Sequence, residues 1–168
     1  MRKEIINHLI YYTAFFVFLT VANSLYSLNY WPLYVGGLVG LFMPNIDHLL
    51  HVFVLKPQEL TSLRVTGLFK NKQIREAIIL LYDTREERKE LMFHTVLYQL
   101  IFAVLTFWVV SSSGNLFGRG LVLAYYLSLV IFNLKKFVNK ELIFGDTDQT
   151  RIYFAAQVIL LFVFGLLV

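Results

Sequence analysis

The chain has 168 residues, of which 58% are hydrophobic and 15% charged, and its net charge is +4. A water-soluble domain of this size exposes too much of its surface to hide that apolar fraction, and the mean hydropathy of +0.64 indicates a membrane protein. Because the sequence contains no cysteine, disulfides, thiolate nucleophiles and sulfur-based zinc sites are excluded.

Apolar stretches predict an all-α, polytopic integral membrane protein, with one membrane domain over residues 1–168 and about five transmembrane helices. Crossing a hydrocarbon core of about 30 Å takes about 20 mostly apolar residues. The predicted spans cover residues 5–25, 31–55, 91–110, 116–134 and 152–168. The first is long and rich in Phe and Tyr, which favours a permanent helix over a cleaved signal peptide. The fourth is the weakest, because Gly118-Arg119-Gly120 interrupts its outer end.

The basic residues predict the orientation of these spans. With the N-terminus in the cytoplasm, only Arg119 of the 15 Lys and Arg residues falls on the outer side. Loops rich in Lys and Arg stay cytoplasmic, so we expect a prokaryotic-type inner-membrane protein with a cytoplasmic N-terminus. Attraction to anionic lipid is a second use of this charge, and nucleic-acid binding is not expected.

Residues 56–90 form the long polar segment between the second and third spans. Its regularly spaced apolar residues are Ile74, Ile78 and Leu81. Their helical spacing among Lys and Arg predicts a cytoplasmic amphipathic helix at the membrane surface, where anionic lipid is the expected partner. Thr84 and Glu87 form a capping-box pattern, which predicts that the third helix begins near residue 85.

Polar residues also precede the fifth span, at 145–149. Asp146 and Asp148 there offer carboxylate oxygens to a site on the cytoplasmic side, but such a stretch more often caps the following helix. We therefore expect an Asp or Thr cap at the start of the fifth helix.

All histidines fall near the predicted inner ends of spans, and an aspartate adjoins two of them. These residues are His8, Asp47, His48, His51 and His94. Ionisable side chains near lipid are rare and usually have partners or a function. Any one of these histidines alone fits an interfacial or packing residue, whereas four at one level with a carboxylate indicate a metal site. Imidazole and carboxylate ligands suit zinc or manganese, and also iron.

The spacing of these residues supports a shared site. Asp47 and His48 lie four and three residues before His51, so each shares a helix face with it. Pro44 opens the helix beside them, and irregular backbone in a membrane is tolerated where it lines a cavity. We expect a water-accessible pocket, open to the cytoplasm.

Three short motifs occur around these residues. They are Asn7-His8-Leu9, Leu41-Phe42-Met43-Pro44-Asn45-Ile46-Asp47-His48 and Phe93-His94-Thr95-Val96-Leu97. With them the chain resembles the LexA-binding, inner-membrane-associated metal-dependent hydrolase family of the YdjM type. The resemblance implies a divalent metal, zinc or manganese, with ligands His8, Asp47, His48 and His94. Asn45, Leu129 and Asn133 occupy positions where that family carries further Asp or His residues.

The leading hypothesis is a membrane-embedded, metal-dependent hydrolase-like protein that acts at the cytoplasmic interface on a lipid phosphoester or ester. In it His51 is a ligand or a proton carrier, and Glu90, one turn before His94, orients that ligand. An alternative is a catalytically degenerate relative that serves as a structural or partner-binding membrane subunit, with 56–90 as its docking surface. A third is a proton or metal-ion carrier. Arg119 is the one charged residue in the outer half, so no series of ionisable side chains continues a path across the membrane, which argues against a carrier.

Overall fold

A computed structural model describes residues 2–84, 93, 95–139, 143 and 146–168. The structure is all-α, about 85% helical, and its described residues include no strand. This confirms the predicted all-α class. The chain divides into two compact units, one formed by Arg2–Pro44 with Gln99–Val168 and the other by Asn45–Tyr98.

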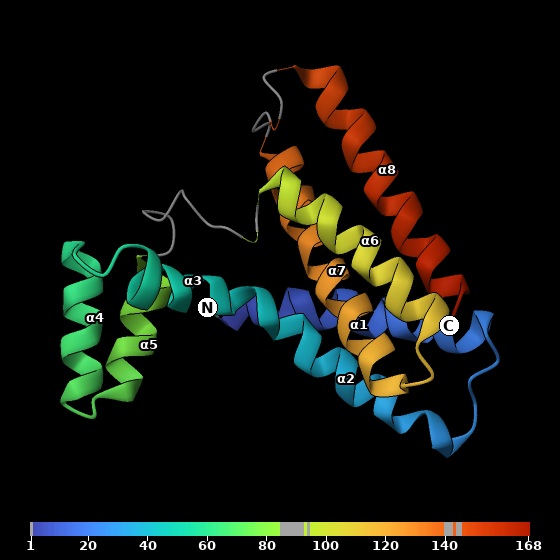
Figure 1. The fold of residues 1–168 in the computed structure, drawn as a ribbon, viewed down its shortest axis with the longest axis horizontal. Coiled ribbons are helices and arrows are strands. Elements are labelled where there is room, and N and C mark those ends of the chain that lie inside the picture. The colour runs from blue at the N-terminus through green and yellow to red at the C-terminus, as the bar shows by residue number, and fades with distance from the viewer. Residues whose placement is uncertain (1, 85–92, 94, 140–142, 144–145) are drawn as a thin grey trace. The chain divides into compact units, whose positions relative to one another are not determined.

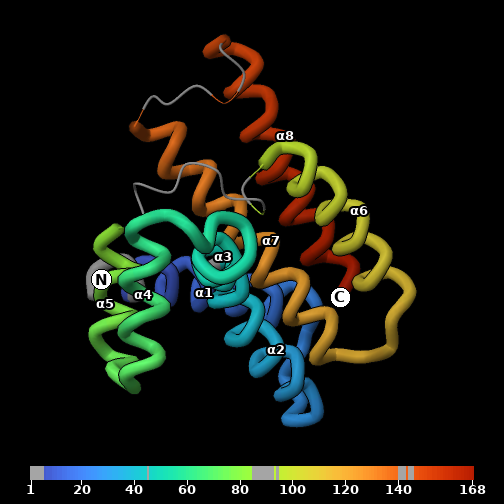
Figure 2. Tube along the Cα trace, turned by 60° about the vertical axis from the view of Figure 1, so that its left-hand side comes forward, coloured from blue at the N-terminus to red at the C-terminus, as the bar shows by residue number. Residues whose placement is uncertain are grey.

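The first unit, hereafter the helical bundle, contains most of the apolar helices. They are α1 (Arg2–Ala22), α2 (Trp31–Phe42), α6 (Val96–Ser112), α7 (Leu116–Val138) and α8 (Thr147–Leu166), with a short 3-10 helix (Leu28–Tyr30) before α2. α7 contacts α1, α2 and α8 (Figures 1 and 2), and its middle turns are buried almost all round. α7 is therefore the central helix of the bundle.

The start of α7 differs from the interruption predicted there. Asn115 caps the helix, its side-chain oxygen accepting the backbone N–H groups of Phe117 at 3.0 Å and Gly118 at 3.3 Å. Arg119 lies inside the helix and its Nε donates to the Ser113 carbonyl oxygen at 2.7 Å. The cap supplies the partners that the first turn lacks, so the Gly118–Gly120 stretch continues the helix.

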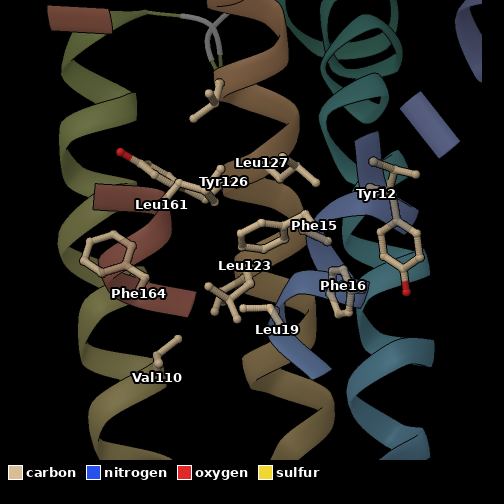
Figure 3. Packing of buried hydrophobic residues seen from close by; sticks show 14 of the residues in the cluster. Tyr12, Phe15, Phe16, Leu19, Val110, Leu123, Tyr126, Leu127, Leu161 and Phe164 are labelled. Carbon is tan, nitrogen blue, oxygen red and sulfur yellow. The ribbon is translucent and has the colours of Figure 1, made fainter. Parts of the chain in front are cut away.

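The bundle core is built largely from aromatic and leucine side chains. Figure 3 shows Phe15 and Leu19 of α1 beside Leu123 of α7, with Phe164 of α8 in the same cluster. The ring centroids of Tyr126 and Phe164 lie 5.5 Å apart and tilted, an arrangement that aromatic pairs favour. The core joins helices from both ends of the sequence.

Glycines let α2 and α7 approach with backbone against backbone. A Cβ on Gly36 would collide with the carbonyl oxygen of Phe117, and one on Gly40 would collide with that of Leu121. The reciprocal contact places Gly120 of α7 against the Leu33 carbonyl. Small residues four apart are typical of close helix pairs in membranes.

The second unit, hereafter the polar unit, contains short helices. A 3-10 helix (Met43–Asn45) leads into it at Pro44, followed by α3 (Ile46–Leu50), a π-helix (His51–Leu55), α4 (Leu60–Lys70) and α5 (Ile74–Asp83). The predicted break in the 31–55 stretch thus lies at Pro44. α4 and α5 form a hairpin (Figure 1).

The helix predicted around Ile74, Ile78 and Leu81 is present as α5, and α4 precedes it as a second helix in the 56–90 segment. The turn between α4 and α5 has Lys72 at a φ of 58°, while the Gln73 N–H donates to the Leu68 carbonyl, a Schellman-type helix ending. Leu81 is buried with Val52 and Val65 in a small core. The predicted capping box and the start of the third helix near residue 85 lie outside the described residues.

Among the described residues, two helices have the length and composition of membrane spans, namely α7 and α8. The helices Leu28–Phe42 and Ile46–Leu55 together make a third if they form one broken span. Ile6–Ala22 and Val96–Ser112 are apolar but shorter than the usual span. The structure thus supports a membrane protein at the level of its helices, and five crossings stay a prediction.

Candidate functional site

Asp47 is the most deeply buried of the predicted site residues. It lies on α3 with no exposed surface, and its Oδ2 accepts the backbone N–H of Phe93 at 2.8 Å. Because burying a carboxylate without partners is strongly unfavourable, this contact stabilises both groups. Asp47 therefore connects α3 to Phe93 within the polar unit.

His51 follows one turn after Asp47 and is also buried, with 2% of its surface exposed. Its Nε2 lies 3.3 Å from Oε2 of Glu59, whose other oxygen lies 3.6 Å from Lys56 Nζ. A carboxylate on one ring nitrogen fixes the orientation of an imidazole and raises its strength as a ligand. The other nitrogen, Nδ1, is buried and has no hydrogen-bond partner among the described residues.

The backbone changes its winding at His51. The segment passes from α-helix at Leu50 to π-helix at His51, and the Lys56 N–H donates to the His51 carbonyl at 2.8 Å. Single π turns are rare and often occur at functional sites. A hollow of about 410 Å³ lies beside this segment, lined by residues 55–59. Glu59 is part of its wall, so the His51–Glu59 pair borders solvent on one side.

The remaining predicted site residues are distributed along the chain. His48 is half-buried on α3, and His8 is half-buried on α1 in the helical bundle. His94 and Glu90 lie outside the described residues. Within residues 2–84, 93, 95–139, 143 and 146–168, no group of three or more His, Asp or Glu side chains is arranged to hold a metal. The convergence of four histidines stays a prediction.

The helical bundle contains a second polar cluster that sequence reasoning missed. It consists of Gln99 on α6, Asn133 on α7, and Tyr153 and Gln157 on α8. The three amides are buried, with 2–3% of their surfaces exposed. Polar residues inside otherwise apolar helices were the signal for this cluster, since such residues in membranes usually bind one another.

Gln99 Oε1 is the acceptor at the centre of this amide cluster. It accepts from Asn133 Nδ2 at 2.8 Å, from the Tyr153 hydroxyl at 2.7 Å and from Gln157 Nε2 at 2.8 Å. Asn133 Nδ2 also donates to Gln157 Oε1. The amides carry no charge at any ordinary pH, so they can hold the three helices together without placing a charge between them.

Leu129 and Asp146, two further positions that the sequence raised, have structural roles. Leu129 is fully buried in α7, and the Ser128 hydroxyl donates to the Leu41 carbonyl of α2 at 3.0 Å. Asp146, considered as a possible oxygen ligand, accepts the Asp148 N–H at 3.2 Å and caps α8. The predicted cap is thus confirmed.

Comparison with family models, with curated proteins and with solved structures finds no match to this chain. The part of the chain that the structure describes is all-α and includes two helices of membrane-spanning length and composition.

Proposed function

We propose that the chain is a membrane-embedded, metal-dependent hydrolase-like protein of a prokaryotic-type inner membrane, with a cytoplasmic N-terminus. The distribution of Lys and Arg supports the orientation. The motifs around His8, Asp47 and His94 support the family relationship. The site acts at the cytoplasmic interface on a phosphoester or ester of a lipid.

The observation that carries the proposal is the arrangement around His51. Glu59 holds one ring nitrogen, while the other is buried without a partner among the described residues, one turn from the buried carboxylate of Asp47. An imidazole held by a carboxylate, with its second nitrogen free to bind, is the usual setting of a histidine metal ligand. Asp47 and His51 are thus suited to bind one divalent ion.

The residues that would hold the metal are His8, Asp47, His48 and His94, with His51 as a fifth ligand or a proton carrier and Glu90 orienting His94. Nitrogen and carboxylate donors fit zinc or manganese. A bound ion of this kind supplies a water molecule acidic enough to act as a nucleophile near neutral pH. Asn45, Leu129 and Asn133 contribute no charged ligand, so a single ion is proposed rather than a pair.

Elemental analysis of detergent-purified protein tests the proposal. Wild type should contain about one equivalent of zinc or manganese per chain, and Asp47→Asn and His94→Gln should each lower that content at least about tenfold, the usual effect of losing a ligand or its support. Asp83→Asn removes an exposed carboxylate of the same unit and serves as the control. Unchanged metal content in both ligand variants would remove the metal site and the hydrolase with it.

A second function has its own supporting observation, the engagement of Asn133 in the amide cluster. Where the family resemblance implies a carboxylate, the chain has a neutral side chain that joins α6, α7 and α8. This favours a catalytically degenerate membrane subunit with a structural or partner-binding role. Purified wild type without stoichiometric metal, but co-purifying with a fixed membrane partner, is the result that this alternative predicts.

A further inference from the structure

The hairpin of α4 and α5 presents apolar side chains outward as well as inward. Ser62 and Val65 of α4 and Ala77 and Leu81 of α5 are buried. Outside this small core, four large aliphatic residues are 50–66% exposed, and they are Leu60, Leu63, Ile74 and Ile78. Exposed aliphatic residues at helical spacing on two neighbouring helices are typical of a surface that meets lipid or another protein.

Charged residues divide around the exposed stripe of α5. Successive residues of α5 are about 100° apart around the helix axis. One side of the helix therefore carries Ile74, Arg75, Ile78 and Tyr82, and the opposite side carries Glu76 and Asp83. Arg75, Glu76 and Asp83 are exposed. Arg75 thus lies within the exposed apolar arc that runs from Ile74 to Ile79, and the acidic residues lie beyond the far edge of that arc.

α4 and the turn also place cations beside exposed aliphatic side chains. Leu60 and Leu63 lie opposite the buried Val65, and the exposed cations Arg64 and Lys70 flank them around the axis. Lys72, in the turn, adds another exposed cation. Both helices thus place Lys and Arg beside exposed aliphatic side chains.

We propose that the α4–α5 hairpin binds the surface of a bilayer containing anionic phospholipid, with Ile74 and Ile78 among the acyl chains and Arg75 and Lys72 at the phosphates. Aliphatic insertion beside a basic rim is how interfacial helices bind, and the cations match the charge of anionic headgroups. The proposal does not depend on the metal site, because none of these residues is a predicted ligand.

Lipid is favoured over a protein occupant for a physical reason. The polar segment lies between apolar helices in the sequence, so once those helices are inserted the hairpin is tethered to a membrane surface. Tethering raises the local concentration of headgroups at no further entropic expense, whereas a separate protein must be recruited from solution. A protein occupant is therefore one of the outcomes that the test distinguishes.

The sequence has no cysteine, so single cysteines can carry an environment-sensitive fluorophore in the full chain. We would label Ile78→Cys and, as the matched control, Glu76→Cys, an exposed position two residues away and about 160° around the helix. The labelled protein is placed in nanodiscs of phosphatidylcholine, with or without roughly a third of phosphatidylglycerol as the anionic lipid. Quenching by nitroxide-labelled lipid then reports contact with the bilayer.

In anionic nanodiscs, the label at position 78 should be quenched at least about threefold more than the label at position 76. Raising the salt to about 1 M, or adding Lys72→Glu with Arg75→Glu, should remove at least about half of that quenching. Circular dichroism checks that the double variant keeps its helices. The salt titration tests the same electrostatic attraction without the two charge substitutions.

Equal quenching at both positions would overturn the proposal. Quenching at position 78 that changes neither with salt concentration nor with the content of anionic lipid would also overturn it. A label at position 78 that is shielded from water yet not quenched by lipid would show that protein covers the face, and this result too rejects the lipid surface.

Discussion

Asn133 is the residue on which α6, α7 and α8 meet. Its amide nitrogen donates to Gln99 and to Gln157, and both partners are themselves buried. Within a helix bundle surrounded by lipid, such amide pairs hold neighbouring helices without placing a charge there. The neutral side chain therefore suits a structural contact at this position.

Replacing Asn133 with Leu should destabilise the helical bundle. The variant keeps most of the volume but removes two donated hydrogen bonds and leaves the oxygen of Gln157 short of a donor, which should lower the free energy of unfolding by about 1–3 kcal/mol. Unfolding in mixed micelles with increasing SDS, followed by circular dichroism, measures the change. Asn139→Leu, at an exposed position near the end of the same helix, should shift it by less than about 0.5 kcal/mol.

If the two substitutions destabilised the protein equally, the amide cluster would contribute nothing specific. From the sequence alone, Asn133 was noted only because the family resemblance implied a carboxylate at that position. Its partners lie 34 and 24 residues away in the chain, and local spacing does not encode contacts of that range. For Asp47 and His51, four residues apart, helical geometry predicts a shared face, and both side chains are buried.

Among the helices, the contact of α2 with α7 depends on glycine. Because Gly36 and Gly40 place their Cα atoms against carbonyl groups of α7, any side chain there separates the helices. The Gly-x-x-x-Gly spacing was present in the sequence, but it does not name the partner helix. The structure identifies that partner as α7.

Gly36→Ala should destabilise the bundle by about 1–3 kcal/mol, because its methyl group would overlap the Phe117 backbone, which cannot move aside as a side chain can. Gly67→Ala is the matched control. A Cβ at Gly67, inside α4, meets no atom within 4 Å, so alanine there should stabilise that helix by up to about 1 kcal/mol through its better helix propensity. The same SDS titration measures the change in unfolding free energy for Gly36→Ala. Hydrogen exchange of the α4 amides measures the effect of Gly67→Ala. An unchanged stability of Gly36→Ala would contradict the close contact between α2 and α7.

The elements themselves were predictable to different degrees. Apolar length predicted stretches corresponding to α1, α7 and α8, because hydrophobic runs report directly on burial in lipid or core. Ile74, Ile78 and Leu81 were predicted as one membrane-facing stripe, yet Leu81 packs inward with Val65. Periodicity defines an apolar arc around a helix, but tertiary contacts decide which edge of that arc a neighbour covers.

Across the whole molecule, the predicted ligands are divided between two units. His8 belongs to the helical bundle, while Asp47, His48 and His51 belong to the polar unit. An ion bound by Asp47 and His51 would stabilise the polar unit, because a ligand that binds only the folded state favours folding.

The orientation of the chain can be tested with single cysteines in the cysteine-free background. Gly114→Cys and Gln58→Cys place the thiol at exposed positions. The sequence predicts that position 114 lies outside the membrane and position 58 in the cytoplasm. A Cβ at position 114 meets no neighbouring atom. In intact cells with a permeable outer layer, a membrane-impermeant maleimide should label position 114 at least about tenfold faster than position 58, since the hydrocarbon core of about 30 Å excludes the charged reagent. Lysing the cells should make the two rates similar.

Asn139→Cys extends the same measurement across α7, whose far end carries Lys135 and Lys136. Like position 58, it should react only after lysis, because positively charged helix ends stay in the cytoplasm. Labelling of positions 114 and 139 from the same side would mean that α7 does not cross the bilayer. The predicted inner-side location of the four histidines would then fail as well, because assigning the Lys-rich and Arg-rich loops to one face requires α6 and α7 each to cross the bilayer once.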